Sequence, residues 1–93
     1  MPNAVTVRFY AAAAEAAGTK EISVPLGTES VTLNEFLESL PKSAPGTVDS
    51  GGRSLSGVCG YSSFLINSVQ ASPSQAHLTA GDTLDILPPF AGG

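Results

Sequence analysis

The first part of the chain alternates between apolar and polar positions on either side of an alanine-rich run. In the segment VTVRFY every second residue is apolar, so that Val5, Val7 and Phe9 share one face of an extended chain. This alternation predicts a half-buried strand. The run AAAAEAAG that follows predicts a short helix ending at Gly18, and the renewed alternation in KEISVPL predicts a second strand.

A helix with a well-marked beginning is predicted in the segment SVTLNEFLESLP. Thr32 and Glu35 have the spacing of a capping box, in which the threonine hydroxyl accepts a hydrogen bond from the backbone N–H three residues later. Val31 and Phe36 are spaced for the hydrophobic staple that accompanies such a cap. Pro41 is expected to end the helix. The apolar stripe that faces the core comprises Leu33, Phe36, Leu37 and Leu40.

The segment Pro41–Val58 is rich in proline, glycine and serine. Compact domains rarely contain so long a stretch without regular structure. Either Val48 and Leu55 attach this segment to the core, or the segment is a mobile surface loop. We favour the surface loop.

The last third of the chain predicts three short strands. The apolar run at 64–66 is followed by a turn at 67–68 and a returning strand, and LTAGD marks another turn. In the final strand, TLDILP, Leu84 and Ile86 share one face, whereas Leu87 lies on the other, polar face.

Together these elements predict an α+β domain, with a single mixed sheet and one main helix packed across it. The helix supplies a crossover between the halves of the sheet, so the first and last strands can lie side by side at its centre, in parallel. We expect the folded domain to comprise residues 1–87 and a flexible tail to comprise residues 88–93.

Composition narrows the range of partners. The chain has 93 residues, of which 42% are hydrophobic and 13% charged, as is typical of one folded domain. Its net charge of −4, with only four basic residues, argues against nucleic acid and membrane as partners and favours a basic protein cleft. Because Cys59 is the single cysteine and no apolar run is long enough to span a membrane, we expect a cytoplasmic protein.

The sequence offers no constellation of catalytic side chains. Cys59 and His77 are the only residues of their types, so there is no set of zinc ligands and at most one Cys–His dyad. We favour a buried, unreactive Cys59, because a lone cysteine in an apolar stretch is usually a small core residue. Asp82 and Asp85 are interpreted as a solvated edge rather than as an acid–base pair. We therefore expect this chain to bind no metal and no cofactor.

The terminal segment LPPFAGG has little side-chain chemistry but a distinctive shape. Leu87 lies on an otherwise polar strand face, and with Phe90 it could form a docking patch. The arm beyond Leu87 spans at most ~20 Å when extended, and its glycines suit a slot too narrow for side chains. The carboxylate of Gly93 is ionised at neutral pH and is a poor electrophile, so another enzyme must activate it, most simply as a mixed anhydride with a nucleotide. The alternative is an ordinary frayed terminus.

Nearly the whole chain, apart from Pro41–Val58, resembles the small sulfur-carrier subunits of molybdopterin synthase, which belong to the ubiquitin-like ThiS/MoaD family. The segments that carry the resemblance are VTVRFYAAAAEAAG, VTLNEFLESL, FLINSVQA and LTAGDTLDILPPFAGG, of which the ending PPFAGG is the most specific. The resemblance implies a ubiquitin-like β-grasp fold, in agreement with the order of elements predicted above.

The resemblance also implies a function for the tail. An E1-like enzyme would adenylate the carboxylate of Gly93 with ATP, and a sulfur donor protein would convert it to a thiocarboxylate. The loaded tail would enter the large subunit of molybdopterin synthase, in a heterotetramer, and give its sulfur to cyclic pyranopterin monophosphate. In this scheme Gly93 carries the sulfur, Gly92 lets it fit, Phe90 and Ala91 lie in the partner's channel, and Leu87 packs on the partner. The chain would be a component of a reaction and not a self-sufficient catalyst.

Other functions remain open at this stage. A carrier for thiamine thiazole or cysteine synthesis needs the same tail, and so does a ubiquitin-like modifier joined to lysines through Gly93. A β-grasp binding module with an inert terminus is a third alternative. The ending PPFAGG favours the molybdopterin branch.

Overall fold

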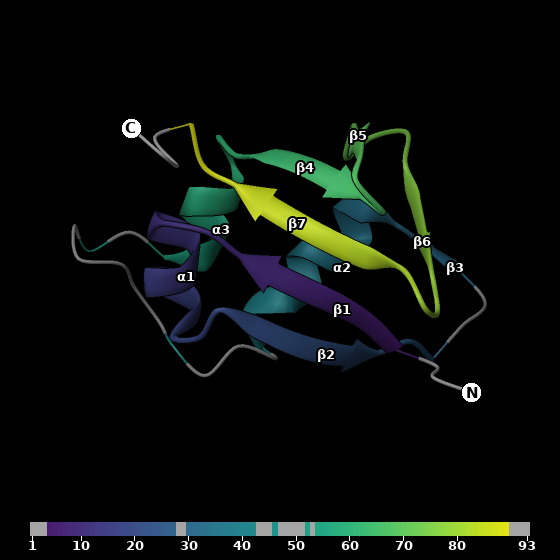
Figure 1. Ribbon diagram of the computed structural model, residues 1–93, viewed down its shortest axis with the longest axis horizontal. Coiled ribbons are helices and arrows are strands. Elements are labelled where there is room, and N and C mark those ends of the chain that lie inside the picture. Colours follow the sequence, from purple (N-terminus) through teal and green to yellow (C-terminus); the bar gives the residue numbers. More distant parts are fainter. Residues whose placement is uncertain (1–3, 28–29, 43–45, 47–51, 53, 90–93) are drawn as a thin grey trace.

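A computed structural model describes residues 4–27, 30–42, 46, 52 and 54–89 (Figure 1). The strands in the described part of the chain are β1 (Ala4–Phe9), β2 (Glu21–Pro25), β3 (Ser30–Thr32), β4 (Ser63–Ile66), β5 (Val69–Ala71), β6 (His77–Thr79) and β7 (Thr83–Leu87). The helices are α1 (Ala12–Ala17), α2 (Leu33–Ser39) and α3 (Leu55–Cys59), with a short 3-10 helix, η1 (Leu40–Lys42), directly after α2.

The main sheet has five strands in the order β2-β1-β7-β4-β5. At its centre β1 and β7 run parallel, with Val7 opposite Leu84 and Phe9 opposite Ile86. The other neighbouring strands are antiparallel. Figure 1 shows the purple β1 and the yellow β7 side by side in the middle of the molecule. The predicted parallel pairing of the first and last strands is confirmed.

A second, two-stranded sheet joins β3 to β6, in addition to the single sheet that the sequence predicts. Val31 lies opposite Leu78, and Thr32 lies opposite His77. Each strand has three residues, which is too short for a period of two to be recognised, and the residues of β3 also form the cap of the next helix. Leu78 is fully buried, so this small sheet closes one end of the core.

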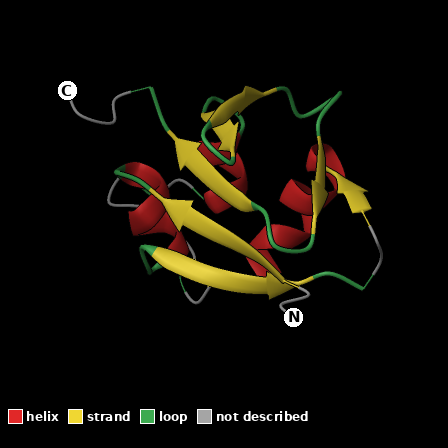
Figure 2. Ribbon diagram, turned by 45° about the vertical axis from the view of Figure 1, so that its right-hand side comes forward, coloured by secondary structure: helices red, strands yellow, loops and turns green. Residues whose placement is uncertain are grey.

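The helices pack on one face of the main sheet, and Figures 1 and 2 show α2 and α3 lying across that face. Alternate residues of the central strands point into this layer and are buried, as their spacing predicts. The core cluster includes Val5, Val7, Phe9, Phe64, Leu84 and Ile86 from strands and Ala13, Ala16, Ala17, Leu33, Phe36, Leu40, Leu55 and Val58 from helices. The opposite face, here termed the outer face, carries the remaining residues of β1, β4 and β7.

The predicted cap of α2 is present. The hydroxyl of Thr32 accepts a hydrogen bond of 3.1 Å from the backbone N–H of Glu35. Leu33 and Phe36 are buried, as the helical stripe predicts. The α-helix ends at Ser39, and Pro41 lies within η1, because a proline ring is incompatible with a further α-helical turn.

The C-terminal end of Pro41–Val58 is helical, which contradicts the expectation of a surface loop there. Leu55 is 2% exposed and Val58 is fully buried, so α3 is held by packing against the core. The sequence contains one local signal for this helix: the hydroxyl of Ser54 accepts a hydrogen bond of 3.1 Å from the backbone three residues later. Serine and glycine inside α3 hide its helical pattern. Val48 lies outside the described residues.

The end of α1 is fixed by two glycines. Gly18 follows the helix as predicted and has a φ of 76°, in the left-handed region that glycine adopts at low cost. The N–H of Gly46 donates to the carbonyl oxygen of Ala17 at 2.6 Å. A Cβ atom at Gly46 would lie 2.5 Å from the nitrogen of Gly18, so this close approach requires a glycine.

Candidate functional site

Side chains of mixed character gather on the outer face where β1 and β7 end. We term them the outer-face cluster: Arg8, Tyr10, Leu65, Asp85 and Leu87. Asp85 lies opposite Arg8 on one side and opposite Leu65 on the other. Leu87 follows Asp85 by two residues on β7, and Tyr10 follows Arg8 by two residues, directly after the end of β1, so the alternation places both on the same face. The N–H of Tyr10 donates to the carbonyl oxygen of Ile86 at 3.3 Å and holds the two strand ends together.

The apolar members of the cluster are partly accessible to solvent. Tyr10 is 37% exposed, and Leu65 and Leu87 are half-buried. Sequence reasoning identified Leu87 but missed Tyr10 and Leu65. The alternation of apolar and polar positions places Tyr10 and Leu65 on the polar face of the sheet. This pattern indicates a shared site only when β1, β7 and β4 are known to be neighbours. The three side chains make a surface that suits a protein partner.

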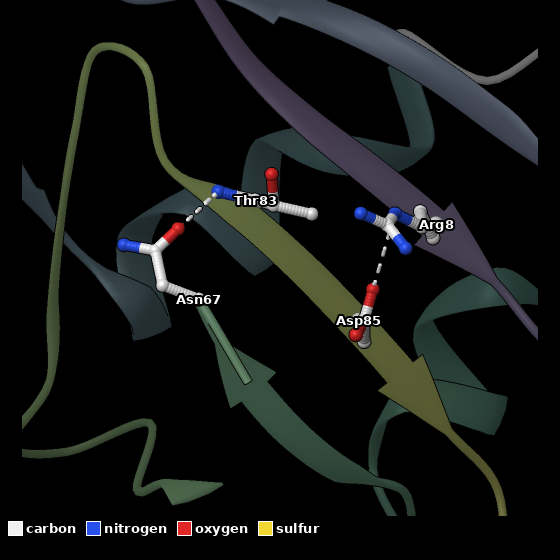
Figure 3. Close-up of polar contacts among 4 residues, drawn as sticks. All are labelled: Arg8, Asn67, Thr83 and Asp85. Atoms are coloured by element: carbon white, nitrogen blue, oxygen red, sulfur yellow. Dashed lines mark hydrogen bonds and ion pairs between the residues drawn. The ribbon is translucent and has the colours of Figure 1, made fainter. Parts of the chain in front are cut away.

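The polar members of the cluster form an ion pair (Figure 3). The Nε atom of Arg8 lies 3.7 Å from the Oδ1 atom of Asp85. The Arg8 side chain is 49% exposed and the Asp85 side chain is 13% exposed. The Oδ1 atom of Asp85 is buried and accepts no hydrogen bond from the residues that the structure describes. Asp85 is thus not the solvated edge residue that the sequence predicts.

The tail leaves the domain next to the cluster. Pro88 follows β7 and is buried, and Pro89 is exposed. The predicted site residues Phe90, Ala91, Gly92 and Gly93 lie outside the described residues. Leu87 is therefore the predicted site residue that the structure places, and it lies at the exit of the tail.

A cleft of about 400 Å³ extends from the cluster towards α1. Its lining comprises Arg8, Phe9, Tyr10, Ala11, Ala14, Lys20 and Glu21. Arg8 and Lys20 contribute two cations, and the lining contains no histidine or cysteine. With the carboxylate of Glu21, the cleft is a partly charged recess beside the cluster.

Cys59 and His77 do not form a dyad. Cys59 is buried in α3 and His77 is exposed on β6, and Figure 1 shows these elements towards opposite ends of the molecule. Burial raises the pKa of the Cys59 thiol to about 11, so the thiol is protonated at neutral pH and is a poor nucleophile. The interpretation of Cys59 as a core residue is confirmed. Among the described residues, no group of three or more histidine, cysteine or acidic side chains could hold a metal ion.

The turns at the other end of β7 are braced by polar contacts. The Nδ2 atom of Asn67 donates to Oδ1 of Asp82 at 3.0 Å. The Oδ1 atom of Asn67 accepts from the N–H of Thr83 at 3.0 Å (Figure 3). Oδ2 of Asp82 accepts from the N–H and the hydroxyl of Thr79. Partial burial raises the pKa of Asp82, but the hydrogen bonds from Thr79 and Asn67 outweigh it, and the net pKa is lowered. This network fixes β7 from its first residue.

Comparison with known proteins identifies the family. The sequence profile of the ThiS family matches residues 7–93, which is nearly the whole chain and includes the tail. The chain belongs to the ThiS family. This is a family of ubiquitin-like sulfur carriers and modifiers whose members act with E1-like enzymes and partner subunits. A comparison with curated proteins gives no match.

Solved structures of similar proteins confirm the ubiquitin-like β-grasp fold. The small archaeal modifier protein 1 of Haloferax volcanii is 24% identical, with a TM-score of 0.69 over 97% of this chain and 99% of the other. The same modifier from Methanosarcina acetivorans is 29% identical, with a TM-score of 0.61 over 100% of this chain and 99% of the other. A Pyrococcus furiosus protein designated a candidate molybdopterin converting factor, subunit 1, is 18% identical, with a TM-score of 0.66 over 92% and 97%.

None of the helices within the described residues has the length and apolar character needed to cross a membrane. The family assignment, the outer-face cluster and the exit of the tail beside it define the candidate site.

Proposed function

We propose that this chain is a sulfur carrier that works through the carboxyl group of its last residue, Gly93. The observation that carries the proposal is the family match, which extends through residue 93 and so includes the diglycine ending. The position of Leu87 supports it, because the final strand brings the start of the tail to a partly apolar surface on the outer face. A partner that grips this surface holds the tail within reach of its own active site.

The chemistry begins with activation by an E1-like enzyme. A carboxylate oxygen of Gly93 attacks the α-phosphorus of ATP, and pyrophosphate leaves. Hydrosulfide then attacks the carbonyl carbon of the acyl adenylate and AMP leaves, so that one oxygen of the carboxylate has been replaced by sulfur. A donor protein's persulfide would instead give an acyl disulfide, from which a second thiol releases the thiocarboxylate by forming a disulfide with the donor. The activating enzyme supplies the ATP site, so the carrier needs no nucleotide pocket of its own.

Leu87 and the last four residues of the chain have separate roles in delivery. Gly93 carries the sulfur, and Gly92 has no side chain to obstruct a narrow channel. Phe90 and Ala91 belong to the part of the tail that enters the partner's channel. Leu87 packs on the partner surface together with Tyr10 and Leu65. Tyr10 and Leu65 add to the docking patch that the sequence predicts, because they lie beside Leu87 on the outer face.

For the acceptor we propose the molybdopterin branch. The loaded tail enters the large subunit of molybdopterin synthase, in a heterotetramer, and gives its sulfur to cyclic pyranopterin monophosphate. Two deliveries complete the dithiolene. The support is the ending PPFAGG and the similarity to the Pyrococcus furiosus protein. The test is transfer from thiocarboxylated chain to that substrate in the presence of the large subunit. Formation of molybdopterin is expected. If the chain instead forms no molybdopterin in this assay but supports thiazole formation with the corresponding thiamine enzymes, it belongs to another branch.

Protein modification is the second candidate, and the similarity to two small archaeal modifier proteins favours it. In this case a lysine amine attacks the acyl adenylate or a thioester derived from it and forms an isopeptide bond with Gly93. Trypsin would leave the long segment Ser54–Gly93 on the target, because no lysine or arginine follows Arg53. Cleavage after Phe90 with chymotrypsin would instead leave a short Ala-Gly-Gly remnant on lysine. Detection of this remnant by mass spectrometry would establish conjugation, and a Gly93 deletion is the control.

A further inference from the structure

The outer-face cluster contains a charged residue whose position is unusual for a surface that binds a partner through apolar contacts. Asp85 lies in the middle strand of the cluster, between Arg8 on β1 and Leu65 on β4. Its side chain is 13% exposed, so it already has little contact with water before any partner binds. A partner that covers Tyr10, Leu65 and Leu87 would also cover Asp85 and remove the remaining solvent.

The contact with Arg8 does not satisfy this carboxylate. The separation between Nε and Oδ1 is 3.7 Å, which is longer than a hydrogen bond, and Oδ1 accepts no hydrogen bond from any described residue. A buried acceptor without a donor is destabilising, and more so when it is charged. Arg8 is half exposed and provides electrostatic compensation, and a donor from a partner reaches the buried Oδ1 atom only where the Arg8 side chain moves aside.

We infer that Asp85 is a specificity-determining residue of the outer-face cluster, and that it accepts a hydrogen bond from an arginine or lysine side chain of the E1-like activating enzyme. This inference rests on the proposed function. The activating enzyme is chosen because adenylation of Gly93 is required in every version of that function, whether the sulfur goes to a pterin, a thiazole or a thiolated product.

The charge of the chain favours a cationic donor over a neutral one. The net charge is −4 with only four basic residues, so the chain is attracted to a basic surface. A carboxylate with two oxygens can accept from Arg8 and from a second cation together. An apolar partner surface would instead remove the remaining solvent from the Asp85 carboxylate without supplying a donor, and such a partner would be disfavoured. Apolar contacts from Tyr10, Leu65 and Leu87 thus supply adhesion, and Asp85 selects among partners that offer similar apolar contacts.

The test measures the affinity of the activating enzyme for the full-length chain by titration calorimetry, at low and at moderate salt concentration. Asp85→Asn preserves the shape but removes the charge, and we expect its dissociation constant to rise at least about ten-fold. The matched control is Glu38→Gln, which changes the net charge by the same amount at an exposed position of α2, on the other side of the sheet. We expect at most a two- to three-fold change for this control, because an exposed remote charge acts mainly through long-range steering.

Arg8→Gln distinguishes an enzyme-supplied cation from a purely internal pair. If the enzyme brings a cation to Asp85, removing the competing charge of Arg8 increases the affinity. If Arg8 and Asp85 act only as an internal unit, both variants weaken binding alike. We also expect the affinity of the unmodified chain to fall more steeply with salt than that of Asp85→Asn. Circular dichroism and the thermal midpoint show whether each variant is folded. If Asp85→Asn fails to fold, the affinity of Arg8→Gln for the enzyme still tests the inference.

Two results would overturn the inference: Asp85→Asn binding with the affinity of Glu38→Gln, or Arg8→Gln weakening binding as much as Asp85→Asn. A separate assay tests the proposed function: ATP–pyrophosphate exchange catalysed by the enzyme with the unmodified chain. Exchange together with either overturning result removes only the role of Asp85. Absence of exchange and of binding by the unmodified chain removes the proposed function and this inference together.

Discussion

Replacing Asn67 with alanine removes the side chain that connects the β4–β5 turn to the start of β7. The Nδ2 atom of Asn67 donates to Asp82 at 3.0 Å, and its Oδ1 atom accepts from the backbone of Thr83 at 3.0 Å. Asn67 also has a φ of 51°, in the left-handed region that asparagine tolerates better than alanine. The substitution therefore removes two hydrogen bonds and adds backbone strain at one position.

The expected loss of stability follows from these contacts. A hydrogen bond contributes about 0.5–1.5 kcal/mol net, and both bonds here are exposed, so the lower half of that range applies to each. Alanine in the left-handed region adds about 1 kcal/mol. The free energy of unfolding should fall by roughly 2–3 kcal/mol. At about 4–8 °C per kcal/mol for a domain of this size, the thermal midpoint should fall by roughly 10–20 °C.

Thermal denaturation followed by circular dichroism measures this shift, with two companion variants. Asn67→Gly loses the same hydrogen bonds without the strain, so it should recover about 1 kcal/mol relative to Asn67→Ala. Asn34→Ala makes the same chemical change at an exposed position of α2, where alanine suits the helix, and should stay within about 0.5 kcal/mol of the unmodified chain. An Asn67→Ala midpoint within about 2 °C of the unmodified chain would refute the bracing role of this side chain.

Three further predictions concern other parts of the molecule. The lowered pKa of Asp82 means that its carboxylate stabilises the fold above the unfolded-state pKa of about 3.9 and loses this effect as the pH falls through the lower folded-state value. The difference in thermal midpoint between the unmodified chain and Asp82→Asn should therefore shrink from pH 7 to pH 3. A difference that stays constant over this pH range would contradict the prediction. Gly46→Ala should lower the free energy of unfolding, measured in urea, by about 1–3 kcal/mol, because its Cβ would meet backbone atoms at 2.5 Å. Gly27→Ala has open space and should be neutral or slightly stabilising, so equal effects of the two substitutions would contradict the close approach at Gly46. Leu87→Asp should weaken binding of the activating enzyme about ten-fold or more with the domain still folded, whereas Val69→Asp, on an exposed position of edge strand β5, should not; unchanged binding by Leu87→Asp would remove this residue from the docking surface.

The sequence predicted those elements whose signal is local and strong. The alternation around Val7 and Leu84 defined the two central strands, and the cap at Thr32 located the beginning of α2. Each of these signals arises within a few residues of the chain, and tertiary packing reinforces it. The parallel pairing of β1 with β7 followed from the order of the elements, since the helix provides the crossover.

What the sequence did not reveal depends on contacts between distant segments. The helix α3 exists because Leu55 and Val58 pack into the core, although its serine and glycine have weak helical preference. Tyr10 and Leu65 belong to the candidate site because the sheet brings three strands together, and neither strand alone indicates this. Asp85 was assigned to a solvated edge, because sequence parity shows which face a residue occupies but not how deeply its neighbours bury it.

The most direct test of the sulfur-carrier proposal is the mass of the intact chain after incubation with its E1-like activating enzyme, ATP and a sulfide source. Replacement of one oxygen by sulfur predicts a gain of about 16 Da, located on Gly93 by fragmentation of the tail. A chain that lacks Gly93 should show no gain while keeping its thermal midpoint, because a terminal arm contributes little to the core. No gain in the unmodified chain, with the same enzyme preparation active on another carrier, would contradict the proposal that Gly93 carries sulfur.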